Sequence, residues 1–415
     1  MTKPSKYVQI LELLSVYGTA FFSLSLQQSM TFVVPLWALT MNASPVLIGL
    51  STSVSAVLPA LLSISYGSII DRLSPKKTIF ISAPILIALS LLHPVFPFIG
   101  VLILFQLLYG QFQAMSWISA QTHITKTYGV SSPRILNLFA LFSNVGTFLG
   151  PLLMGILWEF YGAWGAFLGL AGWAACLWFF SSLITNNRMN DDGTFTLNER
   201  AEWSNLLPQW NDYKKTLAIL SIPAIVIVVI ATFLRLVGFG IRGSFYVVYL
   251  EQIAPNAIVI SLLFSLCPFF SIFSPLITNW LLKFFDDRKL LIFSALMCII
   301  PFAVTPLFTK IWVLGLLSIV GGTFLGLTLP LMMRIVSSSV QPEVQGLAIG
   351  LREMANRWSA AITPFIFGLL VASIGLNISF FAIGLLAVIP TMLVMPFLLR
   401  RDREYRMQNS SKVVL

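Results

Sequence analysis

The sequence predicts an all-α membrane protein of about twelve transmembrane helices, in two six-helix bundles related by pseudo-twofold symmetry. Three observations predict this fold: the composition, the length of the apolar runs, and Gly, Pro and Asn residues that recur at a constant offset in the two halves of the sequence. Of the 415 residues, 57% are hydrophobic and 10% are charged, whereas soluble domains contain about 45–50% apolar and about 25% charged residues. The mean hydropathy of +0.89 is typical of a chain whose solvent is lipid.

The apolar runs favour helices over a membrane β-barrel. Inside a bilayer every backbone N–H and C=O must be hydrogen-bonded within the chain, which leaves helices or a closed barrel. Barrel strands would alternate apolar and polar residues over about ten positions, but the runs at 46–70, 217–234 and 379–399 are continuous. Each run approaches or exceeds the roughly 20 residues that cross a bilayer as a helix.

The polar breaks between these runs define the expected spans and domains. We expect helices near 11–39, 45–70, 78–96, 99–122, 135–160, 164–185, 217–250, 256–283, 290–308, 312–336, 347–373 and 377–399. The domains are expected to be an N-terminal six-helix bundle at 1–185, a cytoplasmic central loop at 186–216, a C-terminal six-helix bundle at 217–399 and a cytoplasmic tail at 400–415.

Basic residues indicate the orientation of the chain. Of the 25 Lys and Arg, five lie within expected spans and only Lys310 faces the side opposite the termini, which leaves nineteen on the side of the termini. This asymmetry places both termini in the cytoplasm, and a bacterial inner membrane is the expected location. The net charge of +10 then reflects topology and not a nucleic-acid partner. The first apolar run follows Lys3 and Lys6 without a small-residue cleavage pattern, so we expect it to remain as a helix.

Gly, Pro and Asn residues recur in the two halves at an offset of about 214 residues. Shifting the first half superimposes Pro151 on Pro364, Gly155 on Gly368 and Gly162 on Gly375. The Asn-Ala pair at 42–43 likewise falls on the pair at 256–257. A common offset in separate regions indicates an internal repeat, and repeats of six helices predict two bundles that face each other across a central cavity.

The loop after the second expected span reads GSIIDRLSPKK. Its basic residues hold a short loop in the cytoplasm, and its acid can sit at a helix N-terminus. The loop resembles the signature of the major facilitator superfamily, Gly-x-x-x-Asp-Arg-x-Gly-Arg-Arg/Lys, although Ser74 replaces the second Gly. The matching residues are Gly67, Asp71, Arg72, Lys76 and Lys77. The resemblance covers the whole chain and implies a secondary transporter that works by alternating access.

The fifth expected span carries a second pattern of the same family, Gly-x-x-x-Gly-Pro. Gly146 and Gly150 lie on one helix face, Pro151 follows and can bend the span, and the segment ends at Gly155. In the family this pattern is reported chiefly in exporters, so the resemblance implies efflux. Small residues at this spacing are also common in membrane helices that only pack closely.

A third family pattern, an Arg followed four residues later by Gly in the fourth span, is linked to proton coupling. Here Gln106 precedes Gly110 instead. The usual proton-relay residue is therefore absent from its expected position. His93 and His123 lie near the ends of expected spans, where an interfacial histidine is the expected role.

Charged residues within the spans are the main functional signal. A charge at bilayer depth costs about 2.5–3.5 kcal/mol on insertion scales, so it should face a cavity or a partner. The expected substrate-binding residues, which face one another from the two halves, are Arg235, Arg242, Arg352, Arg357, Asn356, Gln28, Gln111, Gln113 and Asn144, with Gln27 and Gln106 as further polar candidates. The alternative is that some of these arginines bind only Glu353, helix carbonyls or lipid headgroups.

Glu353 is the only acid expected deep in the second half, and it has two possible roles. Alone it would be a proton carrier, whereas beside an arginine it would be a fixed counter-ion. Arg357 follows it by one helical turn, a spacing that favours an ion pair. Glu353 is a fixed counter-ion if Arg352 or Arg357 turns toward it, and this is the role that we favour.

The sequence therefore predicts an efflux-type facilitator for a small organic anion or amphipathic metabolite, with protons as a candidate coupling ion. A multidrug/proton antiporter is the alternative, and a membrane-embedded receptor or enzyme is a remote one. We expect a monomer with no cofactor, metal site or catalytic residues. Substrate identity, coupling ion and direction of transport are left open.

Overall fold

The computed structural model describes residues 6–62, 66, 69–70, 73–128, 133–184, 219–340 and 342–413. Two predicted features lie outside these residues. The first is the central loop at 186–216, and the second is the part of the basic loop that contains Gly67, Asp71 and Arg72.

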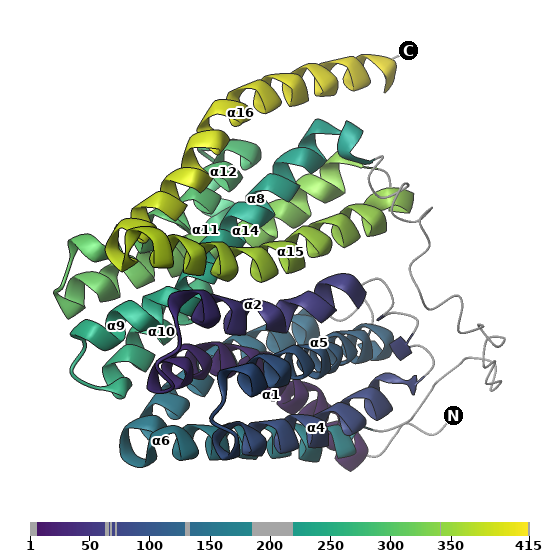
Figure 1. Ribbon diagram of the computed structural model, residues 1–415. Coiled ribbons are helices and arrows are strands. Elements are labelled where there is room, and N and C mark those ends of the chain that lie inside the picture. Colours follow the sequence, from purple (N-terminus) through teal and green to yellow (C-terminus); the bar gives the residue numbers. More distant parts are fainter. Residues whose placement is uncertain are drawn as a thin grey trace.

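The described chain is built of helices in two layers, with the N-terminal half below and the C-terminal half above in Figure 1. The first half contains α1 (Lys6–Thr40), α2 (Pro45–Leu62), α4 (Pro75–Val95), α5 (Ile99–Tyr128) and α6 (Pro133–Ser182). The second half contains α8 (Pro223–Ile241), η3 (Arg242–Tyr246), α9 (Val247–Ile253), α10 (Ala257–Ser271), α11 (Ser274–Leu281), α12 (Asp287–Met297), α13 (Ile300–Ala303), α14 (Ile311–Ser339), α15 (Pro342–Ile374) and α16 (Leu376–Val413).

These helices form the predicted six segments in each half. Among the described residues nine helices are long and apolar enough to cross a membrane, and α10 with α11, bent by 45°, makes a tenth. The α6 helix holds two segments, because Gly162 breaks it with a φ of 61° that only glycine adopts without strain. The α12–α13 stretch is a short, interrupted segment. The predicted fold class is confirmed.

The internal repeat is visible in the backbone. Gly162 and Gly375, which the offset superimposes, both have a positive φ, of 61° and 82°. Each ends the fifth segment of its half and lets the chain turn into the sixth. The repeat thus extends to the conformation of single residues.

The two halves touch closely at one end. We call the end where α1 begins and α16 ends the terminal end, and the opposite end the far end (Figure 1). At the far end a Cβ on Gly155 of α6 would lie 2.1 Å from Ser261 Oγ of α10. A Cβ on Gly368 of α15 would lie 2.7 Å from Pro45 O of α2. Gly155 and Gly368 are repeat equivalents, so the same small residue brings α6 to α10 and α15 to α2.

A carboxylate adds a polar contact between the halves at the far end. Glu159 Oε2, on α6, accepts a hydrogen bond of 2.8 Å from the backbone N–H of Ala257, the first residue of α10. An N–H at a helix start has no partner within the helix, and an anion there is favoured by the helix dipole. The far end is therefore closed by both packing and hydrogen bonding.

A buried ion-pair cluster holds the terminal end of the second half. Asp402 of α16 is 1% exposed, and its Oδ2 lies 2.6 Å from Arg288 Nε of α12 and 3.0 Å from Arg406 Nε. Arg288 also donates to Asp287 and, at 3.1 Å, to Ser339 Oγ of α14. The α16 helix runs to Val413, beyond the predicted span at 377–399, and this cluster fixes its extension.

Replacing Asp402 with Asn should destabilise the protein by about 3 kcal/mol, because it leaves the buried Arg288 with one fewer anionic partner. Unfolding in a denaturing detergent titration measures this. Glu404→Gln is the matched control: Glu404 lies on the same helix and binds Arg400 on the surface, where ion pairs contribute little. Equal effects of the two substitutions would contradict the proposed importance of the buried cluster.

Candidate functional site

A cavity of about 1240 Å³ lies between the two halves. Its walls come from α1, α2, α5 and α6 on one side and from α8, α10, α14 and α15 on the other. From Gln28 and Arg242 the lining continues toward the terminal end, where Gln121, Met333 and Ile349 belong to it. Because the far end is closed, the cavity is directed to the terminal end.

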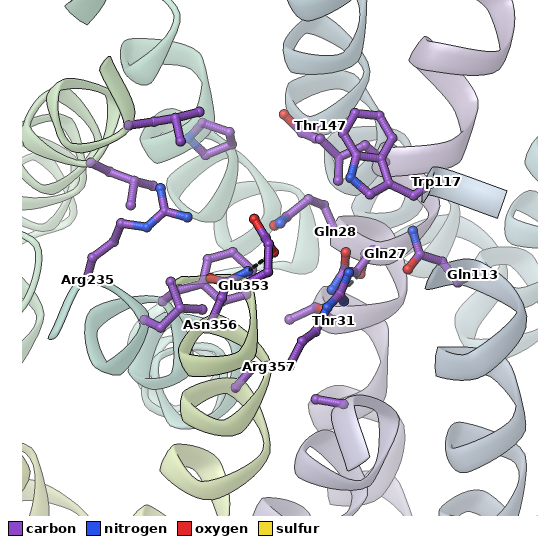
Figure 2. A pocket seen from close by; sticks show the side chains of 18 of the residues that line it. Gln27, Gln28, Thr31, Gln113, Trp117, Thr147, Arg235, Glu353, Asn356 and Arg357 are labelled. Carbon is purple, nitrogen blue, oxygen red and sulfur yellow. Dashed lines mark hydrogen bonds between the residues drawn. The ribbon is translucent and has the colours of Figure 1, made fainter. Parts of the chain in front are cut away.

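The two walls differ in chemistry (Figure 2). The wall from the second half carries Arg235, Arg242, Arg352, Glu353, Asn356 and Arg357. Among the described residues of the wall from the first half, the polar groups are neutral, namely Gln27, Gln28, Gln106, Gln113, Gln121, Asn144 and hydroxyl residues. Four arginines and one glutamate give the described lining a net positive charge. A cation would be repelled by such a cavity and an anion attracted.

Arg242 closes the cavity toward the far end and joins the halves. Its side chain lies in η3 and is almost fully buried, at 1% exposure. Nη2 donates to Gln28 Oε1 at 2.8 Å and Nη1 to Phe264 O at 2.9 Å, while Cζ stands 4.1 Å from the centroid of the Phe264 ring. Gln28 and Arg242 are 214 residues apart, which is the repeat offset. Equivalent positions of two repeats meet where the pseudo-twofold axis passes.

Arg235 and Arg357 form no ion pair with any acid that the structure describes, although Glu353 lies close enough to interact electrostatically with Arg235. The contact of Arg235 with Thr328 Oγ1 is long, at 3.4 Å, and its Nε has no hydrogen-bond partner. Arg357 makes no hydrogen bond or ion pair with any residue that the structure describes. In Figure 2 both side chains lie at the space between the walls. Two guanidinium groups are thus available to a bound molecule.

Glu353 pairs with Arg352 and not with Arg357. Its Oε1 accepts from Arg352 Nη2, and its Oε2 accepts from Asn356 Nδ2 at 3.3 Å. Of the two arginines that could turn toward Glu353, Arg352 does so, and the pair with Arg357 that helical spacing favours is not formed. Arg352 and Glu353 are neighbours in the sequence, so this pair is local to α15. The consequence is that Arg357 keeps its full charge in the cavity.

Gln111 does not line the cavity, contrary to the prediction. Its Oε1 accepts a hydrogen bond of 2.8 Å from the Tyr66 hydroxyl. Gln106 and Gln113 are seven residues apart on α5 and share a face, whereas Gln111 is five residues beyond Gln106 and points elsewhere. Helical spacing alone places Gln111 on a different face of α5 from Gln106 and Gln113. Only the positions of the neighbouring helices show which of these faces lines the cavity.

His93 lies in the last turn of α4, where it is buried and contacts a residue of the cavity wall. It is 1% exposed, its Nδ1 lies 2.6 Å from Leu89 O, and its Nε2 lies 3.0 Å from Gln106 Nε2. The sequence offered no signal for this contact, because His93 sits near the end of its span. Trp117 is a further lining residue that sequence reasoning missed.

The glycines of the fifth segment serve helix packing. A Cβ on Gly146 would lie 2.2 Å from Phe21 O, and one on Gly150 would lie 2.4 Å from Ser29 Oγ, both on α1. Pro151 follows at a buried position. In the basic loop, Lys76 Nζ donates to Ser182 O at 3.0 Å and ties α4 to the end of α6, while Lys77 is exposed.

Enlarging Gly49 should open the far end, because a Cβ there would lie 2.3 Å from Pro364 O across the contact between α2 and α15. Spin labels at Ala43→Cys and Lys310→Cys, in the far-end loops of the two halves, would report a longer distance in Gly49→Leu. Gly100→Leu is the control, since a Cβ at Gly100 meets nothing within 4 Å. An unchanged distance in Gly49→Leu would show that this contact does not hold the halves together.

Comparisons with known proteins give a consistent family. A family model described as Major Facilitator Superfamily matches residues 14–234 and again residues 228–413. A comparison with curated protein sequences gave no significant match.

Solved structures agree on the fold. The crystal structure of a point mutant of the nucleoside transporter NupG superposes with a TM-score of 0.76 at 16% identity, covering 92% of this chain and 99% of that one. A bacterial homologue of the human lysosomal transporter Spinster, in an inward-facing and unoccupied conformation, gives a TM-score of 0.69 at 17% identity, covering 97% of this chain and 93% of that one. At these identities the likeness concerns the fold alone.

Proposed function

Because the chain belongs to the Major Facilitator Superfamily, we propose that this transporter exports a small organic anion or amphipathic metabolite by alternating access. The observation that carries the anion is the pair Arg235 and Arg357, which line the cavity without an acidic partner. A guanidinium group at membrane depth is costly unless its charge is compensated. Its fork of N–H donors matches the two oxygens of a carboxylate, phosphate or sulfonate.

The shape of the cavity supports binding from the cytoplasm. The far end is closed by the Gly155 and Gly368 contacts and by Glu159, and the lining is directed to the terminal end. The excess of Lys and Arg in loops at that end favours the cytoplasm as its location. In alternating access the two bundles then rock about the midplane site and expose it to the far side. The resemblance of Gly146, Gly150 and Pro151 to the exporter pattern favours the same direction.

Proton-coupled multidrug transport is the second candidate. It would require an acid able to exchange protons or to attract a cationic drug. Among the described lining residues the acid is Glu353, and Arg352 and Asn356 already hold its two oxygens. This arrangement favours a fixed counter-ion, so we place the anion transporter first.

Arg235→Gln and Arg357→Gln should each weaken anion binding about tenfold or more, because each removes a charge-assisted contact. Purified protein would be screened for thermal stabilisation by carboxylates, sulfonates and phosphate monoesters, and any anion that stabilises would be tested by counterflow in proteoliposomes. Arg334→Gln is the control, because Arg334 is exposed and lies outside the lining. Altered drug resistance with intact anion binding in the cavity variants would favour the multidrug alternative.

Glu353→Gln should leave the pH dependence of counterflow unchanged if Glu353 is a fixed counter-ion. Affinity for the anion should rise or stay the same, since a negative charge is removed from the positive wall. The measurement is counterflow of the stabilising anion with and without a pH gradient. Loss of a proton-driven component in this variant alone would make Glu353 the proton carrier.

A further inference from the structure

We propose that the transported anion carries N–H or O–H donors away from its charged group, and that the amide oxygens of Gln106 and Gln113 bind them. This inference rests on the proposed anion transport and concerns the other wall of the same cavity. It starts from three glutamine amides, those of Gln28, Gln106 and Gln113, whose orientation is fixed by a hydrogen-bond partner in the protein. Each partner can play only one role in a hydrogen bond, so each amide has only one arrangement.

The Gln106 amide is oriented by His93. A backbone carbonyl only accepts, so the 2.6 Å contact with Leu89 O requires a proton on His93 Nδ1. In the neutral ring Nε2 is then an acceptor, and the Gln106 atom that lies 3.0 Å from it must be the NH2 group. Phe167 stacks on the imidazole at a centroid distance of 5.0 Å and holds the ring in place. Gln106 therefore turns its oxygen away from His93.

The Gln113 amide is oriented in the same way by a different partner. Its Nε2 donates to Ser23 O at 2.9 Å, and a carbonyl can only accept. Gln106 and Gln113 are 2% and 3% exposed, and both line the cavity. No described residue donates to either Oε1. Two acceptor oxygens thus stand on one face of α5, about 10 Å apart along the helix axis.

Gln28 shows that the arrangement is specific to α5. Its Oε1 is taken by the Arg242 guanidinium, which can only donate. The NH2 group of Gln28 is what remains, so this amide offers a donor near the cationic wall. Gln28, next to Arg242, therefore presents an N–H donor to the cavity, whereas Gln106 and Gln113 on α5 present acceptor oxygens.

The two walls together select a molecule with two different ends. An anionic group fits Arg235 and Arg357, and the other end must bring donors to the α5 oxygens. An anion whose remainder is hydrocarbon would remove water from both oxygens and leave them unpaired, which is costly for buried acceptors. The substrate class is thus a hydroxylated or amide-bearing organic acid or phosphate ester, and fatty acids and other anions whose remainder is hydrocarbon are excluded.

The test uses matched pairs of anions that differ in their donors. The pairs are gluconate with hexanoate, N-acetylglutamate with glutarate, and glucose 6-phosphate with hexyl phosphate. Binding to the purified full chain is measured by thermal stabilisation and by calorimetry. In each pair in which a member binds, the donor-bearing anion should have a Kd at least about tenfold lower. A stripped anion that binds equally well or more tightly would overturn this inference and leave anion transport intact.

Three variants assign the preference to the oxygens. Gln106→Met and Gln113→Met keep the side-chain length and remove the acceptor, so each should reduce the preference within a pair to about threefold or less. Gln111→Met is the matched control on the same helix, because Gln111 binds Tyr66 and not the cavity. A preference that survives in both cavity variants would also overturn the inference. Glucitol, which is uncharged, and tetraphenylphosphonium, which is a cation, are tested beside the anions. If no anion binds, or if only one of these two compounds binds, both the anion-transport proposal and this inference fail.

Discussion

The burial of the Arg242 guanidinium is the constraint on which the centre of the molecule depends. A charge at this depth must find acceptors, and the chain supplies them from both halves, Gln28 from one and the Phe264 carbonyl from the other. The rings of Phe264 and Phe239 cover its faces. One residue therefore fixes how the halves meet near their symmetry axis and sets the inner limit of the cavity.

Around this point the internal repeat determines how the helices pack, and the residues that differ between the two repeats determine the chemistry of the cavity. The equivalent glycines Gly155 and Gly368 give both halves the same close contact across the far end. Gln28 and Arg242 occupy equivalent positions, yet one is a neutral amide and the other a cation. The same contrast holds for the walls as a whole, since the arginines lie in the second half and the amides dominate the first. A symmetric scaffold thus encloses an asymmetric site.

Features set by composition and helical period could be predicted from the sequence, and features set by neighbouring helices could not. Apolar runs predicted the helices, and the offset that superimposes Gly162 on Gly375 predicted the internal repeat. Buried charge predicted that Arg235 and Arg357 face a cavity. The direction of Gln111 and the contact of His93 with Gln106 depend on which helix lies opposite. A single sequence contains no information on that choice.

The unpaired arginines also bear on how the halves could move. Closing the terminal end over an empty cavity would remove water from Arg235 and Arg357 with no charge to replace it, and desolvating an uncompensated charge is costly. A bound anion offsets that cost for the arginines. Donors on the same molecule offset the loss of water from the oxygens of Gln106 and Gln113. Closure is then favourable only around a molecule that satisfies both walls, so the groups that select the substrate also make the movement depend on it.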